Sequence, residues 1–331
     1  MVKIAIVGAG GIANQHVEAI KGINDANIVA VVDVIKEKAD HLADLCDATA
    51  YENMDECLPQ ADMVYILTPP SFHKELAIKA IGSGKHVVVE KPIAINIEDA
   101  EAMVEAARKA EVKLMTAFNM RFRKGFIRLK KTIQSGKLGE IVNFWSQRLG
   151  IGVGPGTNWR TTKGLLCGMS IESLSHDIDL IRWLLGEITD VRAKIFESRK
   201  NLPGFDDNAN IVFSLANGGI ATIHASWSSN LDRNSRGVIG TKGTAIIDGN
   251  GLWDLTHFHL KTSDMENEII EVINDKLDVK SYREESKHFI DCVENNRQPT
   301  ITGEDGLLAL RISHAILTSH RENRVVPVSG C

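Results

Sequence analysis

The chain begins with an apolar run that leads directly into a glycine-rich turn. Residues 4–7 read Ile-Ala-Ile-Val, which is typical of a buried parallel strand. Gly8, Gly10 and Gly11 follow at once, and a helix is predicted to begin near Ile12. This order of elements places backbone N–H groups and the positive end of a helix where a pyrophosphate group can bind.

An acidic residue at the end of the next apolar run supports this interpretation. Residues 28–32 form that run, and Asp33 follows at about the 20-residue spacing expected of a ribose-binding carboxylate. Ala13 stands where a third glycine is usual, which the fingerprint tolerates where the helix packs on its strand. The alternative is an ordinary strand–helix turn with incidental glycines. Asp33 would bind both adenosine ribose hydroxyls and repel a 2′-phosphate, which favours NAD. Lys36 lies close enough in sequence to soften that preference, so NADP is the second candidate.

Composition limits the class of protein. A chain of 331 residues exceeds the size at which single hydrophobic cores stop growing, so two domains are expected. Its apolar fraction of 44% is ordinary for a globular protein, and its net charge of −5 argues against nucleic acid or a membrane as partner. No apolar stretch is long enough to span a bilayer, and no cleavable signal pattern precedes the first strand. Five scattered cysteines without a Cys-x-x-Cys pair indicate thiols in a reducing cytoplasm and no metal site.

Hydrophobic periodicity divides the chain into two parts. In residues 1–118, continuous apolar runs alternate with amphipathic segments, which predicts a parallel sheet covered by helices on both faces. In residues 119–331, apolar and polar residues alternate between glycine turns, which predicts a mostly antiparallel sheet with interposed helices. We therefore expect an α/β protein with an N-terminal doubly wound Rossmann domain and a C-terminal α+β domain for substrate binding and oligomerisation. The alternating segments are residues 141–149, 191–198, 209–215, 220–227 and 238–248.

Polar residues follow one of the predicted parallel strands at residues 63–67. Thr68, Pro69 and His73 come directly after it, at the sheet edge where doubly wound folds bind ligands. They are therefore candidate cofactor contacts. The alternative for His73 is that it only opens the following helix.

A second strand end carries Glu90 and Lys91, which follow the apolar run at residues 86–89 and precede Pro92. These two charged side chains cannot both lie in the hydrophobic core, and the strand ends of such sheets converge on the ligand-binding crevice. Glu90 and Lys91 are therefore expected to line it. The bond between Lys91 and Pro92 is a candidate for the cis form, which would aim the lysine.

Residues 171–185 are predicted to form one amphipathic helix that ends at Gly186. Glu172, His176 and Asp179 follow one another at helical spacing on the side away from its apolar stripe. Such a polar stripe is usually solvated surface. Two carboxylates beside a histidine are also what a proton-transferring base requires, one to orient the ring and one to tune its pKa.

Several segments of the chain together resemble the glucose–fructose oxidoreductase, inositol dehydrogenase and rhizopine catabolism family. The resemblance covers nearly the whole chain, and the Glu-Lys-Pro run with the later histidine helix is its specific part. The segments that carry it are residues 8–13, 68–73, 84–92, 175–179, 236–244 and 303–306.

The resemblance implies roles for individual residues. Lys91 corresponds to the family's active-site lysine and His176 to its usual acid/base, while Glu172 stands where the inositol dehydrogenases carry aspartate. Glu172 is one methylene longer, which leaves the choice among sugars, inositols and related polyols open.

The resemblance also implies the contacts that line the nicotinamide and the substrate. Asn119, Met120 and Arg121 correspond to a segment that contacts both, with Met120 on the cofactor side. Trp159 and Arg160 correspond to a pair on the substrate side.

These correspondences imply an NAD(P)-dependent oxidoreductase that oxidises a secondary hydroxyl of a sugar, inositol or related polyol. His176 would take the hydroxyl proton, Lys91 would hydrogen-bond the reacting oxygen, and Glu172 would orient His176 or bind a neighbouring hydroxyl. One alternative is a glycosidase that retains its NAD and acts by transient oxidation. Another is a non-catalytic dinucleotide-sensing regulator, although such a sensor needs neither Lys91 nor His176.

Other conspicuous residues receive simpler interpretations. His257 and His259 share one face of a predicted strand, and without further ligands nearby they are expected to be surface histidines. The basic run that contains Arg123 is expected to start a helix with a solvated face, apart from Arg121. The alternating strands could pair between subunits, so a homodimer or homotetramer is expected.

Overall fold

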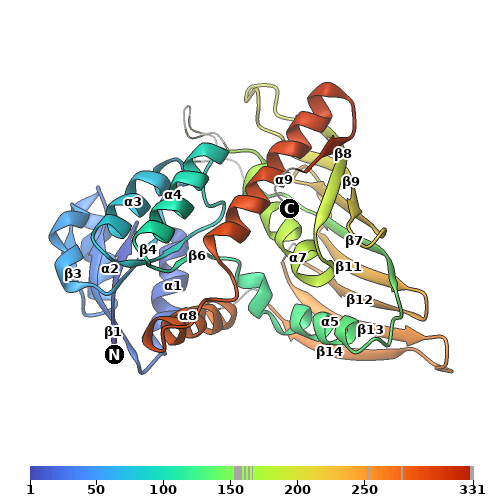
Figure 1. Cartoon of the computed structure of the whole chain (residues 1–331), viewed down its shortest axis with the longest axis horizontal. Helices are drawn as coiled ribbons and strands as arrows, with labels where there is room; N and C mark the ends of the chain where they lie inside the picture. The colour runs from blue at the N-terminus through green and yellow to red at the C-terminus, as the bar shows by residue number, and fades with distance from the viewer. Residues whose placement is uncertain are drawn as a thin grey trace. The chain divides into compact units, whose positions relative to one another are not determined.

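The computed structural model describes residues 1–152, 159, 162, 165, 167–251, 253–276 and 279–328. The chain divides into two compact units, which are described separately (Figure 1). The first unit contains Met1–Asn119 and Asp278–Leu310, and the second contains Met120–Leu277 and Arg311–Cys331. The prediction of a single division after residue 118 differs from these units, because the later helix at Val279–Glu294 packs on the helix at Gly11–Lys21.

A six-stranded parallel sheet forms the centre of the first unit. Its strand order is β3-β2-β1-β4-β5-β6, the arrangement of a dinucleotide-binding Rossmann fold, which confirms the predicted fold class. The strands are β1 (Val2–Val7), β2 (Ala26–Val32), β3 (Thr49–Tyr51), β4 (Met63–Ile66), β5 (His86–Val89) and β6 (Leu114–Thr116).

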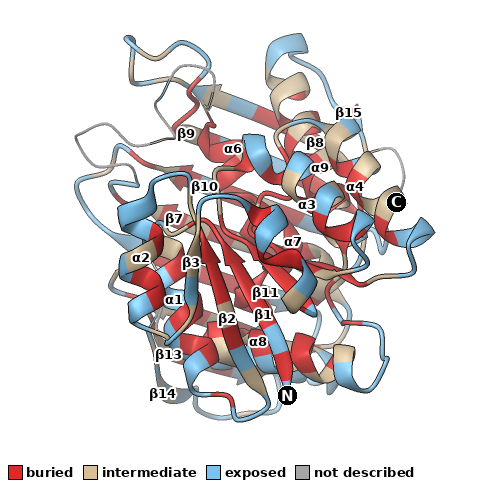
Figure 2. Cartoon of the chain, turned by 90° about the vertical axis from the view of Figure 1, so that its left-hand side faces the viewer, coloured by how far each residue is buried: buried red, intermediate tan, exposed pale blue. Residues whose placement is uncertain are grey.

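Helices cover this sheet, so its central strands are mostly apolar, with Lys3 of β1 the exposed exception. Strand β4 is buried at every position, and Figure 2 shows buried strands beside helices with exposed outer sides. Helix α4 shows how such an element is delimited: the Asn96 side chain accepts from Asp99 N–H, and Arg108 and Lys109 occupy the last turn. The helices are α1 (Gly11–Lys21), α2 (Lys36–Asp44), α3 (His73–Gly82), α4 (Ile97–Lys109), α8 (Val279–Glu294) and the start of α9 (Gly303–Glu322).

A nine-stranded sheet forms the second unit, in the order β14-β13-β12-β11-β7-β10-β9-β8-β15. It is mostly antiparallel, as predicted, with a parallel pair between β7 and β10. The alternating segment at residues 238–248 is a hairpin of two strands, β11 and β12, which turns at Thr241 and Lys242. The strands are β7 (Ile141–Leu149), β8 (Ile188–Phe196), β9 (Asn208–Leu215), β10 (Ile220–Ser226), β11 (Arg233–Gly240), β12 (Gly243–Gly249), β13 (Leu255–Thr262), β14 (Ile269–Asp275) and β15 (Val326–Pro327).

Helix α5 (Lys124–Gln134) packs on β12 and β14, and α7 (Ser175–Leu185) packs on β7. The single helix expected at residues 171–185 is instead two, because α6 (Met169–Glu172) ends before α7 begins. Asp206 fixes the short α6 by accepting from Ser170 N–H and Oγ at 2.8 and 2.6 Å. Gly168 is required there, since an added Cβ would lie 1.9 Å from Asp206 Oδ1.

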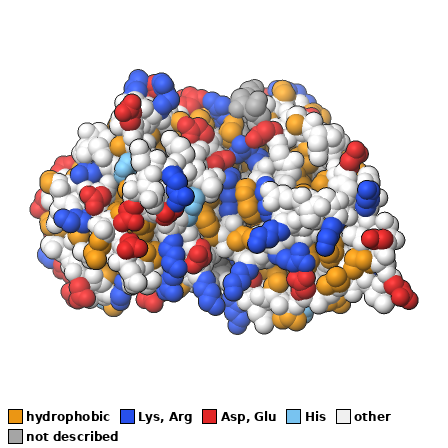
Figure 3. All heavy atoms as spheres, turned by 60° about the horizontal axis from the view of Figure 1, so that its bottom comes forward, with side chains coloured by type: hydrophobic (Ala, Val, Ile, Leu, Met, Phe, Trp, Pro, Cys, Tyr) orange, Lys and Arg blue, Asp and Glu red, His pale blue; other side chains and the backbone are white. Residues whose placement is uncertain are grey.

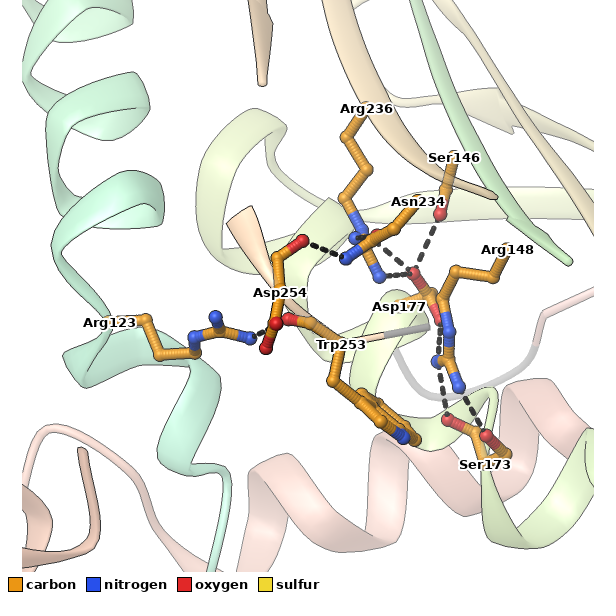
Figure 4. A network of polar contacts seen from close by, with 9 residues as sticks. All are labelled: Arg123, Ser146, Arg148, Ser173, Asp177, Asn234, Arg236, Trp253 and Asp254. Atoms are coloured by element: carbon orange, nitrogen blue, oxygen red, sulfur yellow. Dashed lines mark hydrogen bonds and ion pairs between the residues drawn. The ribbon is translucent and has the colours of Figure 1, made fainter. Parts of the chain in front are cut away.

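A buried ion-pair network joins α7 to this sheet (Figure 4). Asp177 on α7 accepts from Arg148 Nη1 at 2.5 Å and from Arg236 Nη2 at 2.8 Å. Ser146 Oγ donates to the same carboxylate at 2.7 Å, and none of these four side chains is more than 2% exposed. Burial alone would raise the pKa of Asp177, but Arg236 and Arg148 outweigh it and hold that pKa well below its ordinary value.

Strand register explains why two arginines can be buried side by side. Arg148 on β7 lies opposite Asn234 on β11, and Ser146 lies opposite Arg236. Because side chains alternate across a strand, all four residues point to the face that α7 covers. Asp177 therefore meets both guanidinium groups from above the sheet.

The described part of the chain contains no helix long and apolar enough to cross a membrane. The face drawn in Figure 3 carries basic and acidic side chains together with apolar ones.

We predict that Asp177→Asn lowers the free energy of unfolding by about 3–5 kcal/mol at pH 7, because two buried guanidinium groups lose their counter-ion. The depressed pKa of Asp177 means that its stabilising effect is complete above pH ~4, the ordinary carboxyl value, and is lost as the pH falls further. Urea unfolding at pH 7 and at pH 3 measures both effects, and the difference between wild type and variant should shrink at pH 3.

Glu271→Gln is the matched control, because Glu271 also pairs with an arginine, Arg128, at 2.7 Å. Both side chains of that pair are more than one-third accessible on average, so its loss should cost less than about 1 kcal/mol. Equal losses for the two variants would contradict the role assigned to the buried network.

Candidate functional site

The glycine-rich turn of the first unit has the conformation that a phosphate-binding loop requires. Gly8 has φ +99°, and an added Cβ would lie 2.9 Å from the backbone C and O of Leu67. Cβ atoms added at Gly10 or Gly11 would meet nothing within 4 Å among the described residues. Helix α1 starts at Gly11 and Ile12 is half-buried in its first turn, so open space adjoins the N–H groups of the helix.

The carboxylate of Asp33 lies beside this turn. Asp33 Oδ2 accepts from Ala9 N–H at 2.8 Å, and Oδ1 accepts from Ile35 N–H at 2.9 Å. Asp33 is half-buried at the end of β2, where it can still accept bonds from a ligand. Lys36 binds Asp40 at 2.7 Å on the exposed side of α2.

These residues fit a dinucleotide. Thr68 Oγ1 is buried and has no hydrogen-bond partner among the described residues, and the Thr68 methyl group lies 3.0 Å from a Cβ added at Gly8. Gly8, Gly10 and Gly11 would hold the pyrophosphate, and Asp33 would hold the ribose of adenosine. Pro69 precedes the short turn at Pro70–Phe72 and is half-buried beside Thr68.

His73 is fully buried and contacts the protein's own backbone. Its Nε2 lies 2.8 Å from Thr68 O, and its Nδ1 lies 3.1 Å from Pro92 O and 3.2 Å from Ile93 O. Burial lowers the pKa of this imidazole, although the three carbonyl groups oppose the shift. His73 is the first residue of α3, and its ring links the loop after β4 to the loop after β5. Both loops carry predicted site residues.

The loop after β5 is held by a residue that sequence reasoning missed. His16 on α1 is fully buried, and its Nε2 lies 3.0 Å from Glu90 Oε1. Glu90 Oε2 accepts from Lys91 N–H at 2.9 Å, and the Lys91–Pro92 bond is cis, as predicted. His16 lies five residues after Gly11 on α1, so the helix that begins at the glycine turn also contacts the loop of Lys91.

The segment that follows β6 is divided between the units. Asn119 is buried in the first unit, and its Nδ2 lies 3.4 Å from Ser281 Oγ on α8. Met120 and Arg121 begin the second unit, with Met120 buried. Arg121 makes a two-bond ion pair with Asp179 on α7, through Nε at 2.9 Å and Nη2 at 2.5 Å.

Glu172 and His176 are buried in the second unit, with exposed fractions of 4% and 7%. Asp179 is also buried, so the polar stripe is not solvated surface. The ring of His176 lies edge-on to Trp253, with the centroids 6.1 Å apart. Trp159 is half-buried, and Arg160 lies outside the described residues.

The expectation that the basic run containing Arg123 is solvated is wrong for Arg123 itself, which is buried. Its side chain is 2% exposed, donates to Trp253 O at 2.7 Å and pairs with Asp275 at 3.4 Å. The sequence around Arg123 carries no signal of this burial, because both partners come from distant parts of the chain.

His257 and His259 lie on the exposed side of β13, as expected. His259 lies between two carboxylates, 3.3 Å from Asp248 and 2.7 Å from Glu268. Among the described residues there is no group of three side chains that could hold a metal ion.

Comparison with known proteins agrees with both units. Residues 2–118 match the oxidoreductase family described as having an NAD-binding Rossmann fold, and residues 130–328 match its C-terminal alpha/beta domain. Myo-inositol 2-dehydrogenase of Thermotoga maritima is 28% identical over 340 residues, which cover 98% of each chain. The 2,7-anhydro-N-acetylneuraminate hydratase of Escherichia coli is 30% identical over 264 residues, or 75% of this chain and 68% of the hydratase. The crystal structure of aldose-aldose oxidoreductase from Caulobacter crescentus is 26% identical, with a TM-score of 0.88 over 98% of this chain and 99% of that one.

The two matched domains, the Rossmann strand order and the open glycine turn beside Asp33 agree on one assignment. The chain belongs to the glucose–fructose oxidoreductase, inositol dehydrogenase and rhizopine catabolism (Gfo/Idh/MocA) family of NAD-dependent oxidoreductases.

Proposed function

We propose that this protein oxidises a secondary hydroxyl group of a sugar, inositol or related polyol. The observation that carries the proposal is the burial of Glu172 and His176 in the second unit, where a structural polar stripe would face water. The relatives named as a myo-inositol 2-dehydrogenase and an aldose-aldose oxidoreductase support this class of substrate.

Three side chains of the protein have separate roles in the proposed reaction. NAD supplies a hydride acceptor when it is bound. His176 accepts the hydroxyl proton, and the Lys91 ammonium group donates a hydrogen bond to the oxygen as negative charge develops there. Glu172 orients His176 or binds a neighbouring hydroxyl group.

Further residues are proposed to surround the reactants. Met120 would lie on the nicotinamide side, with Asn119 and Arg121 near both cofactor and substrate, and Trp159 and Arg160 would contact the substrate. The bond between Arg121 and Asp179 supports this role, because it holds the guanidinium group in one orientation.

A second candidate is a reaction without net redox change, such as a glycosidase that retains its NAD. The relative named as a hydratase shows that named activities in this family are not all dehydrogenations. Product formation without a rise in NADH absorbance would favour this candidate over the dehydrogenase. A non-catalytic dinucleotide sensor would bind NAD and turn over none of the substrates.

We propose a homodimer or homotetramer in the cytoplasm as the working assembly. Size-exclusion chromatography with light scattering measures the oligomeric state, and a monomer at micromolar concentration would contradict it.

We predict that Lys91→Ala and His176→Ala each lower kcat on the best polyol by about 10²- to 10⁴-fold, the usual contribution of a positioned acid–base group. The assay follows NADH formation over a panel of sugars, inositols and open-chain polyols. The pH dependence of kcat should lose its acidic limb in His176→Ala, because the titrating base is gone.

Lys85→Ala and His224→Ala serve as controls, since Lys85 precedes β5 and His224 is exposed on β10. Both should keep wild-type turnover. If Lys91→Ala and His176→Ala keep it as well, the site assignment is wrong.

We predict that Asp33→Ala lowers kcat/KM for NAD by about 10- to 100-fold, since hydrogen bonds to a charged group are lost. The ratio of kcat/KM for NADP to that for NAD should rise, because the 2′-phosphate is no longer repelled. Asp55→Ala, which removes a surface partner of Lys79, is the control. An unchanged cofactor ratio in Asp33→Ala, at an unchanged melting temperature, would show that Asp33 does not contact the ribose.

A further inference from the structure

Trp253 packs against Arg148 of the buried Asp177 network and, unlike the residues of that network, is partly exposed to solvent. Arg148, Asp177 and Arg236 are at most 2% exposed, whereas Trp253 is only half-buried. The network thus ends in an indole ring that other molecules can reach in part.

Several contacts fix the position of this indole. The Arg148 guanidinium lies 4.1 Å from the ring centroid, within the range of a cation–π contact. Trp253 O accepts from Arg123 Nη1 at 2.7 Å, and the next carbonyl, Asp254 O, accepts from Asn234 Nδ2 at 3.0 Å. Backbone and ring are therefore both held by buried side chains (Figure 4).

The same contacts place the ring beside His176. The two rings are 6.1 Å apart at 78°, an edge-to-face arrangement. Asp177 follows His176 in the chain and pairs with Arg148, whose guanidinium group packs on the Trp253 ring. The Trp253 ring in turn contacts His176, so the four residues hold one another in place. An apolar surface of fixed orientation thus adjoins the proposed base.

We propose that Trp253 forms the apolar wall of the substrate site and selects ring-shaped sugars and polyols over open-chain ones. This inference rests on the proposed function. The hydroxyl groups of a six-membered ring leave a C–H face that packs on a flat aromatic surface, and aromatic side chains commonly line small-molecule sites. An open-chain polyol has no such face. Trp253 would therefore bind the ring while His176 takes its proton.

The test compares Trp253→Phe, Trp253→Leu and Trp253→Ala on myo-inositol and glucose against sorbitol. We expect the Ala and Leu variants to raise KM for the ring substrates by about 10- to 100-fold, and the Phe variant to recover most of that loss. The kcat at saturation and its pH profile should stay close to wild type, because His176 is retained. The KM for sorbitol should change little.

Trp183→Phe and Trp183→Ala are the matched controls. Trp183 lies on α7 with His176 and also has a cation over its ring, Lys130 Nζ at 5.0 Å. These variants should keep the wild-type preference for ring substrates.

Tryptophan fluorescence gives a readout that does not depend on turnover. Saturating myo-inositol or glucose should change the emission of the NADH-loaded protein, in which the reduced cofactor cannot accept a hydride from the polyol. This change should be absent in Trp253→Phe and present in Trp183→Phe. If Trp253→Ala does not fold, Trp253→Leu and the fluorescence of Trp253→Phe still decide the question.

The outcomes separate the two proposals. A wild-type protein that turns over none of the polyols contradicts the proposed function, and the inference fails with it. Turnover by wild type, with unchanged KM and an unchanged ring preference in all three Trp253 variants, overturns the role of Trp253 alone. A shifted pH profile without a KM change would mean that Trp253 only packs against His176, which also overturns it.

Discussion

The second unit depends on the Asp177 carboxylate, which lies between two guanidinium groups in the interior. Taking three charges out of water is costly, so the arrangement is stable only if every charge has partners. Arg148 and Arg236 meet this requirement because the register of β7 and β11 places them side by side beneath α7. This network also fixes the proposed base, because His176 directly precedes Asp177 on the helix that the ion pairs hold to the sheet.

In the first unit, weaker interactions hold the predicted site residues in position. The Asp33 carboxylate accepts hydrogen bonds from two backbone N–H groups, which fix its orientation beside the glycine turn. His16 and Glu90 tie the loop of Lys91 to the helix that begins at the glycine turn. The glycine turn and the loop of Lys91 are therefore both joined to α1.

Predictions from the sequence succeeded where a local pattern carries the information. The apolar strands of the parallel sheet, the helix that follows the glycine turn and the cis bond before Pro92 each follow from a few neighbouring residues. The burial of Arg123 and of the Asp177 partners could not be predicted in this way. A sequence shows that a residue is charged, but its counter-ion comes from another strand or helix, and only the folded chain pairs them.

The sequence by itself determined the Rossmann sheet, the glycine-rich turn after its first strand and the change to a mostly antiparallel sheet, because these follow from side-chain periodicity and from glycine at positive φ. Tertiary structure alone decided three other features: the break between Glu172 and Ser175, the packing of α8 on α1, and the place of Trp253 beside His176. Each of these depends on contacts between residues far apart in the chain, whose free energies no local pattern records.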